Sequence, residues 1–362
     1  MRLRELGISV GQLPVGARNE ITDVTGVRVG HVDIDEAGLT TGITAVLPYA
    51  TKARKLFVGR YGLDGGDGMS GLGVTEDFGA ISTPVMLGPA AAVGKVYDAI
   101  ISRGLGIDTG LSEDAGWPPV VIGVDDSWLN PPATVHQLVS QEHANRALAA
   151  AAQAVSEGSH GIGRGLAAFG GRGGIGTSSR LCTVAGQSLT IGALVAANGG
   201  EPDRLSVDGL PLARNLEEAR RRRLHRDVPR TLAAVIITDA PLIPRQLERL
   251  AGRASFGLAR PGALDGQTRD GLILALSTTG LQEAGDIRDD GTVAAAMVGE
   301  SELTTLFTAA MEACEESLLN ALLQAEPLPH RRLEPFHLEP LAPGDWVEAV
   351  RAHQHSMVEP RG

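Results

Sequence analysis

Residues 231–251, TLAAVIITDAPLIPRQLERLA, contain the pattern that decides the fold. Residues 231–238 form a nearly continuous apolar run, which is typical of a β-strand covered on both faces. After Pro241, apolar residues recur at about helical spacing, and a proline near the first turn is common in helices. The stretch therefore predicts a buried strand followed by a helix.

Further elements are expected on both sides of this stretch. Segments rich in Val, Ile and Thr predict strands, at 21–30, 42–47, 120–124, 180–187, 189–197 and 271–277. Helical spacing predicts helices, at 134–155 and 301–324. The Gly-dense residues 60–83 are expected as a loop that leads into a helix start, and a second Gly-dense region, 158–176, is expected to interrupt the helical segment. The tail 326–362 is expected to wrap the surface. No repeat or low-complexity linker interrupts the 362 residues, which favours a single composite domain over 1–362.

Composition excludes several classes of function. Hydrophobic residues make up 43% of the chain and charged residues 21%, as in ordinary globular proteins. The net charge of -11 does not suit binding to nucleic acid, and the basic run at 220–226 is interpreted as a solvated face. No apolar stretch is long enough to cross a membrane, and the N-terminus lacks the apolar region of a signal peptide. With two well-separated cysteines, the chain is expected to be soluble and cytoplasmic.

Generic catalytic motifs do not account for the sequence. Residues 171–176 match the dinucleotide pattern G-x-G-x-x-G, but the segment that follows resembles a strand, where that fold requires a helix. The chain contains no phosphate-loop lysine, no H-E-x-x-H, no paired-cysteine spacing and no G-x-S-x-G. We therefore expect neither a metal nor an organic cofactor.

Four segments together resemble the DmpA-type family of L-aminopeptidase/D-esterases and β-peptidyl aminopeptidases. They occur in family order and are NEITDVTGVRVGH (19–31), GGIGTSSR (173–180), ANGGEPDRLSVDG (197–209) and TDAPLIPRQLERLA (238–251). The resemblance implies a four-layer αββα sandwich in the α/β class. It also implies that the chain cuts itself once, and that the new N-terminal residue becomes the nucleophile.

In the family, the nucleophile opens the apolar strand that leads into the T-D-A-P motif, which places it at Thr231. Cleavage would fall between Arg230 and Thr231 and would give chains of residues 1–230 and 231–362. A threonine fits this chemistry because its own freed α-amine can serve as the general base. The alternative is that Thr231 only starts a strand, as β-branched residues often do.

The resemblance also implies roles for other residues. Asn198 matches the asparagine that stabilises the oxyanion, although an Asn-Gly pair is also common in turns. Trp128 stands where the family has a tyrosine and is expected to contact the substrate. Asp270, or as a second choice Thr268, is expected to orient the nucleophile and its amine, although this segment also resembles a polar turn.

The leading interpretation is therefore a self-processed amidohydrolase or aminopeptidase. Its substrate would be a small peptide, amide or ester with a free amine next to the scissile bond, and the family resemblance implies a homo-oligomer. Relatives carry small or polar residues before the cut, where this chain has Arg230. That difference, together with Trp128, leaves open an unprocessed homologue that acts as a binding or scaffold protein. An oligoamide or cyclic-amide hydrolase is the other alternative.

Overall fold

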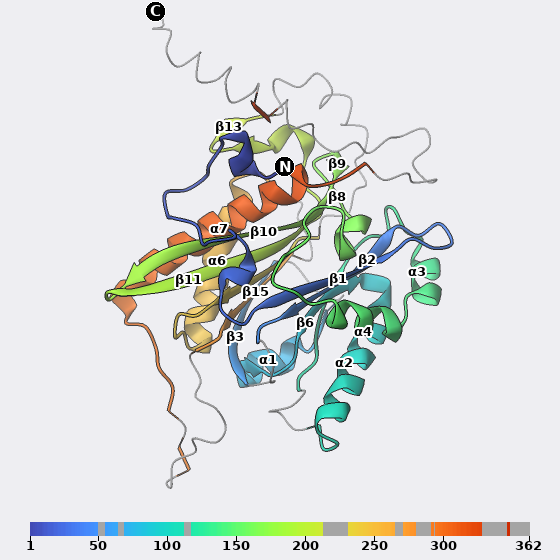
Figure 1. Ribbon diagram of the computed structural model, residues 1–362, viewed down its shortest axis with the longest axis horizontal. Helices are drawn as coiled ribbons and strands as arrows, with labels where there is room; N and C mark the ends of the chain where they lie inside the picture. Colours follow the sequence, from blue (N-terminus) through green and yellow to red (C-terminus); the bar gives the residue numbers. More distant parts are fainter. Residues whose placement is uncertain are drawn as a thin grey trace, which may run out of the picture.

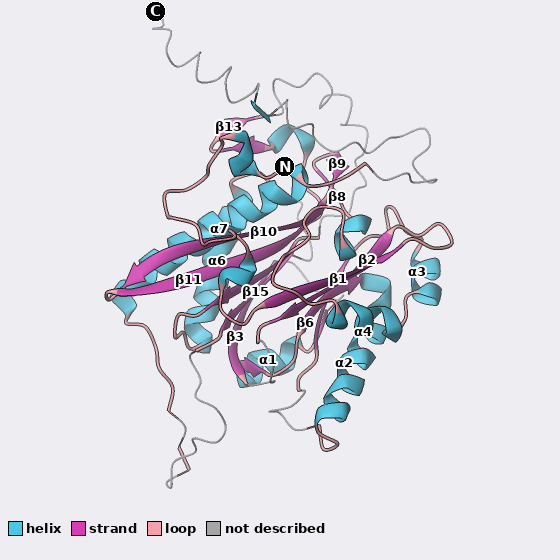
Figure 2. Cartoon of the chain, in the orientation of Figure 1, coloured by secondary structure: helices cyan, strands magenta, loops and turns pink. Residues whose placement is uncertain are grey.

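The structure, a computed structural model, describes residues 1–49, 55–63, 69–111, 117–212, 231–264, 271–279, 291–292, 294–327 and 346–347. These residues form two stacked β-sheets with helices on the outer face of each sheet (Figure 1). Figure 2 shows the strands of both sheets lying between the two groups of helices. The order of layers is helix, sheet, sheet, helix, which is the predicted αββα sandwich.

The first sheet has five strands in the order β1-β2-β6-β7-β4. Its central pair, β6 and β7, is parallel, and the other neighbours are antiparallel. The strands are β1 (Arg28–Ile34), β2 (Thr41–Leu47), β4 (Met69–Ser70), β6 (Val85–Pro89) and β7 (Val120–Val124).

The second sheet has six strands in the order β10-β11-β14-β15-β3-β5. The parallel pair here is β14 with β15, which lies in the middle of the sheet. The strands are β3 (Leu56–Leu63), β5 (Ala80–Ile81), β10 (Gly174–Val184), β11 (Gln187–Ala197), β14 (Ala233–Thr238) and β15 (Gly271–Ser277). Two short hairpins stand apart, β8 (Ala167–Ala168) with β9 (Gly171–Arg172), and β12 (Ser206–Val207) with β13 (Leu210–Pro211).

The helices divide between the outer faces (Figure 1). Those against the five-stranded sheet are α2 (Val93–Ile107), α3 (Pro132–Leu138) and α4 (Gln141–Ala149). Those against the six-stranded sheet are α6 (Pro244–Ala259) and α7 (Leu303–Leu323). The helix α1 (Leu72–Phe78) follows β4. Short 3-10 turns are η1 (Leu3–Leu6), η2 (Ile21–Asp23), η3 (Ala90–Ala92), η4 (Gly161–Gly165), η5 (Pro202–Arg204) and η8 (Glu300–Glu302).

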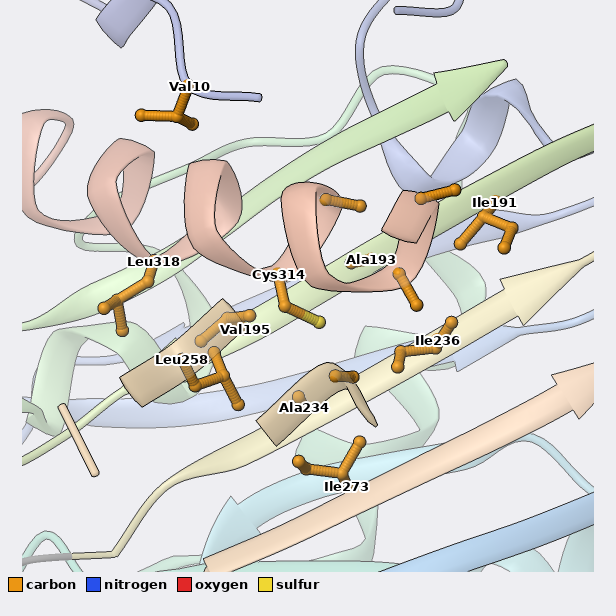
Figure 3. Packing of buried hydrophobic residues seen from close by; sticks show 14 of the residues in the cluster. Val10, Ile191, Ala193, Val195, Ala234, Ile236, Leu258, Ile273, Cys314 and Leu318 are labelled. Carbon is orange, nitrogen blue, oxygen red and sulfur yellow. The ribbon is translucent and has the colours of Figure 1, made fainter. Parts of the chain in front are cut away.

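Strand β14 is buried on both faces, as its apolar sequence predicts. Ala234 and Ile236 pack towards α6 and α7 (Figure 3), whereas Val235 and Ile237 belong to the core between the two sheets. Alternation of side chains along a strand explains how one apolar run can serve two cores. Helix α7 approaches its sheet very closely, because a Cβ at Gly176 would lie 2.0 Å from the carbonyl oxygen of Ser317.

Several sequence predictions are confirmed by the structure. The strands expected at 120–124 and 271–277 are β7 and β15, with the same bounds. The strands expected at 180–187 and 189–197 correspond to the longer hairpin β10–β11, but its turn falls at residues 185–186, inside the first predicted strand. The helix expected at 301–324 contains α7. Within the described residues, no helix is both long and apolar enough to pass through a bilayer.

The strand expected at 21–30 is wrong in its first half, where the structure has the 3-10 turn η2. Polar side chains supply the backbone with other partners there. The Asp23 carboxylate accepts the N–H groups of Arg18 and Glu20, and Thr177 Oγ1 accepts the N–H of Ile21 at 2.7 Å. Such side-chain bonds compete with strand pairing, and β1 begins only at Arg28.

The single helix expected at 134–155 is also wrong. Helix α3 ends at Leu138 and α4 starts after Ser140, whose backbone N–H donates to Nδ1 of His143. Beyond α4, the backbone of Ala152 pairs with Val29 of β1. After α4, the chain therefore pairs with the edge strand β1 and does not continue as the helix that its composition favours.

The loop expected at 60–83 is also only partly right. Strand β3 continues to Leu63, and β4, α1 and β5 occupy much of the remainder. The region 158–176 likewise contains η4 and β9 and runs into β10. Of the tail, 326–327 and 346–347 are described, and Trp346 is 1% exposed within the core under α6 and α7, not on the surface.

Candidate active site

Thr231 lies where the chain enters the central strand of the six-stranded sheet. It stands two residues before the start of β14 and is 7% exposed. The carbonyl of the next residue, Leu232, accepts the N–H of Leu272 at 2.8 Å, which fixes the entry of the chain against β15. The hydroxyl is therefore held at a defined position at one end of the sheet.

Two N–H donors converge on the Thr231 hydroxyl. The Asn198 side-chain amide donates from Nδ2 to Thr231 Oγ1 at 2.7 Å. The backbone N–H of Asp125 donates to the same oxygen at 3.2 Å. Donors arranged in this way can also stabilise negative charge that develops on an oxygen close to the nucleophile.

Asn198 reaches Thr231 because β11 and β14 are neighbours. Strand β11 ends at Ala197, and its Ala196 pairs with Ala233. The orientation of the Asn198 amide follows from its other bonds. Oδ1 accepts the N–H of Ala167 at 3.2 Å, and Nδ2 also donates to the carbonyl of Asp125 at 2.8 Å. The N–H side of the amide therefore faces the nucleophile.

The turn that carries Asp125 is held by a buried carboxyl group. Asp126, 3% exposed, accepts a hydrogen bond from Thr41 Oγ1 at 2.6 Å and one from Asn130 Nδ2 at 3.1 Å. Asn130 in turn accepts the N–H of Thr40. The sequence alone predicts no role for Asp125 or Asp126, because a backbone donor and a buried carboxyl have no distinctive spacing.

The Asp126 carboxyl is expected to make folding stability depend on pH. Burial, reinforced by the neighbouring charge of Asp125, raises the pKa of Asp126 from 3.8 to about 7. Between these values the folded chain keeps a proton that the unfolded chain releases, so this group's contribution to stability falls as pH rises. The shift corresponds to about 4 kcal/mol, at about 1.4 kcal/mol per pKa unit.

Asp126→Asn tests this dependence because an amide does not ionise. Relative to the wild type, the variant should gain up to about 4 kcal/mol of unfolding free energy between pH 4 and pH 8. Urea unfolding of both proteins across this range measures the difference, and all other titrating groups are common to both. Parallel stability profiles would contradict the pKa assigned to Asp126.

The other predicted site residues divide into two groups. Trp128 is half-buried and packs against Leu129 and Ala167, and the N–H of Ala167 donates to Asn198, so the indole lies close to the site. The second group, Arg230, Thr268 and Asp270, lies outside the described residues. The structure thus joins Thr231 and Asn198 directly, and links Trp128 to them through Ala167.

A metal site and a cavity are the other features that could mark a functional site. Among the described residues, no group of three or more His, Cys, Asp or Glu side chains is placed to hold a metal ion. A polar cavity of about 320 Å³ lies between β3, α1 and α6 and is lined by residues that include Arg60, Tyr61, Glu76 and Glu248. The hydrogen bonds of the Thr231 hydroxyl described above involve Asn198 and Asp125 and none of the residues that line this cavity.

A family model describes most of this chain. Peptidase family S58 matches residues 19–334. A β-peptidyl aminopeptidase, BapA, of Sphingosinicella microcystinivorans is 33% identical over 357 residues, which cover 90% of this chain and 86% of BapA. The BapA of Sphingosinicella xenopeptidilytica is 31% identical, over 90% of this chain and 85% of that protein.

Solved structures agree in fold over almost the whole chain. A β-aminopeptidase of a Burkholderia species superimposes with a TM-score of 0.84 at 34% identity, covering 97% of this chain and 99% of that structure. An L-aminopeptidase D-Ala-esterase/amidase of Ochrobactrum anthropi, a prototype for the serine aminopeptidases, gives a TM-score of 0.86 at 30% identity, covering 98% and 99%. That enzyme has a variant of the N-terminal-nucleophile hydrolase fold, which confirms the predicted fold class.

Proposed function

This chain belongs to peptidase family S58, and we propose that it is an aminopeptidase whose nucleophile is the hydroxyl of Thr231. The relatives named above are two β-peptidyl aminopeptidases, a β-aminopeptidase and an L-aminopeptidase D-Ala-esterase/amidase. The solved prototype is a serine aminopeptidase, and threonine supplies the same hydroxyl with one additional methyl group.

One observation carries the proposal. The Thr231 hydroxyl accepts hydrogen bonds from Asn198 Nδ2 and from the Asp125 N–H, at the head of a strand buried on both faces. A threonine that only started a strand would not need two converging donors from segments so distant in sequence. The arrangement supports a nucleophile with an oxyanion site beside it.

We further propose that the chain cleaves itself between Arg230 and Thr231. Thr231 Oγ would attack the carbonyl carbon of Arg230, and the acyl group would pass from the amide nitrogen to the oxygen. Water would then hydrolyse the resulting ester. The products are a carboxylate on Arg230 and a free α-amine on Thr231, whose reference pKa of about 7.7 to 8.0 suits a general base near neutral pH.

The same groups would then hydrolyse a peptide. The freed α-amine would take the proton of the Thr231 hydroxyl as its oxygen attacks the substrate carbonyl. Asn198 and the Asp125 N–H would stabilise the oxyanion until the amine product leaves with that proton. Water would release the acyl group and restore the hydroxyl.

A substrate panel tests this function. The purified protein should release the amine from α-aminoacyl or β-aminoacyl amides, and N-acetylation of the same substrates should abolish the release, since an aminopeptidase requires the free amine. Linear ω-amino acid oligomers in the panel separate oligoamide hydrolysis from aminopeptidase action. Equal turnover of free and acetylated substrates would contradict the proposal.

Asn198→Ala should lower kcat with little change in KM. Removing one donor from an oxyanion site costs about 3 kcal/mol, or about 10²-fold to 10³-fold in kcat. Asn198→Asp is the matched variant, because it keeps the size of the side chain and places a carboxylate where the donor was. Steady-state kinetics of both variants measure the effect, and an unchanged kcat in either would rule out this role.

The roles of Trp128, Asp270 and Thr268, and assembly into a homo-oligomer, stay predictions. We propose Trp128 as a wall of the substrate site because its indole packs on Ala167, next to Asn198.

A further inference from the structure

Arg172, in the short strand β9, has a guanidinium group that is buried without a counter-ion. The residue is 1% exposed. Its Nη2 donates to the carbonyl oxygen of Arg164 at 2.5 Å. Its Nε and Nη1 have no hydrogen-bond partner, and no carboxylate in the described part of the chain forms an ion pair with it.

This arrangement is energetically unfavourable for a cation. A buried charge is expensive unless it is paired and hydrogen-bonded. Burial, with the nearby charge of Arg164 acting in the same direction, lowers the pKa of Arg172 to about 10. Arg180 provides a contrast in the same protein, because its equally buried guanidinium bonds both Glu312 and Glu316. The unpaired N–H groups of Arg172 are therefore suited to an anion from outside the described residues.

Two chains of contacts connect Arg172 with the residues that position the nucleophile. Its backbone stands opposite Ala167 in the β8–β9 hairpin, and the N–H of Ala167 donates to Asn198. Its guanidinium bonds the carbonyl of Arg164, and a Cβ on the following residue, Gly165, would lie 2.9 Å from Cβ of Asp126. Arg172 is thus linked through Ala167 to Asn198, and through Arg164 and Gly165 to the turn that contains Asp126.

We propose that Arg172 forms an anion-binding site in the β8–β9 hairpin, one residue removed from Asn198, and that this site takes a carboxylate group. A guanidinium matches a carboxylate in charge and in planar hydrogen-bond geometry. The carboxylate could come from the C-terminus of a short peptide substrate or from a free carboxylate in solution. Binding of a substrate carboxylate rests on the proposed aminopeptidase function, whereas binding of a free carboxylate does not.

The substrate source is tested by comparing a dipeptide with its C-terminal amide. If the substrate carboxylate binds Arg172, kcat/KM of the wild type should favour the free acid by about 10-fold to 100-fold, the usual worth of a hydrogen-bonded charge pair. Arg172→Met should reduce this ratio to about 1. Arg172→Lys should give an intermediate ratio, because lysine keeps the positive charge but not the paired N–H donors of the guanidinium. The ratio, unlike the turnover itself, is not lowered by a general loss of activity.

The free anion is tested by thermal unfolding in increasing sodium acetate. Binding to the folded state should raise the Tm of the wild type by about 2 °C or more, and the rise should vanish in Arg172→Met. Arg164→Met is the matched control, since Arg164 belongs to the same region but is already paired with Asp33 and Asp35. That variant should respond to acetate as the wild type does.

A loss of acid preference in Arg172→Met would identify the substrate carboxylate as the ligand. An acetate response that depends on Arg172, without acid preference, would identify a free anion and still support the site. The proposal is overturned if neither the ratio nor the acetate response differs between the wild type and Arg172→Lys or Arg172→Met. If Arg172→Met does not fold, Arg172→Lys decides. If the wild type hydrolyses no substrate, the aminopeptidase proposal fails and the acetate comparison alone decides on the site.

Discussion

Thr231→Ala is expected to abolish both self-cleavage and peptide hydrolysis. The substitution removes the only atom that can carry the acyl group in the proposed mechanism, so turnover should fall by about 10⁴-fold or more. The variant should still fold, because the side chain loses only one oxygen and one methyl group. Its activity is measured on the substrate panel, and its fold by circular dichroism.

Thr231→Ser provides the control for this result. It retains the hydroxyl, and the solved prototype from Ochrobactrum anthropi is itself a serine aminopeptidase. Cleavage and turnover should therefore continue in Thr231→Ser. If Thr231→Ala hydrolysed the panel at the wild-type rate, the nucleophile would have to be another group.

Arg180→Met is expected to destabilise the protein by about 3 to 5 kcal/mol, the usual cost of breaking a buried ion pair. Arg180 is fully buried between two carboxylates, with Nε 3.1 Å from Glu312 and Nη2 2.8 Å from Glu316. The same group also donates to the carbonyl of Val10. Its loss would leave Glu312 without an ionic partner among the described residues and loosen β10, α7 and the N-terminal segment together.

Urea unfolding measures this effect, with Arg245→Met as the control. Arg245 also forms an ion pair, with Glu248, but its side chain is 79% exposed. Exposed pairs contribute about 0 to 1 kcal/mol. Equal destabilisation by the two variants would show that the buried network does not have the importance assigned to it here.

The sequence predicts the centre of this fold better than its margins. Strands β7 and β15 were predicted to the residue because each is a short apolar run between turn signals. The failures at 21–30 and 134–155 both involve partners distant in sequence, in addition to the local side-chain bonds of Asp23 and His143. Thr177 bonds Ile21, and Val29 pairs with Ala152. Composition within a window contains no information on such contacts.

Some residues of the candidate site were predicted from the sequence and others were not. Thr231 and Asn198 were predicted from the family resemblance, and their hydrogen bond of 2.7 Å supports that pairing. The Asp125 N–H was not predicted, because every residue except proline has this donor and only the fold selects which one faces the nucleophile. Arg172 was likewise missed, since a buried cation and an exposed one have the same sequence signature.

Self-cleavage before Thr231 is tested by the mass of the purified protein under denaturing conditions. Denaturation is needed because β14 and β15, from the second fragment, lie between β11 and β3 of the first, so the cleaved chains would stay together when folded. We predict two fragments, residues 1–230 and 231–362, with the second beginning Thr231-Leu232-Ala233, and an intact chain for Thr231→Ala. A wild-type chain that stays at 37.6 kDa on long incubation while it hydrolyses the substrate panel would contradict it.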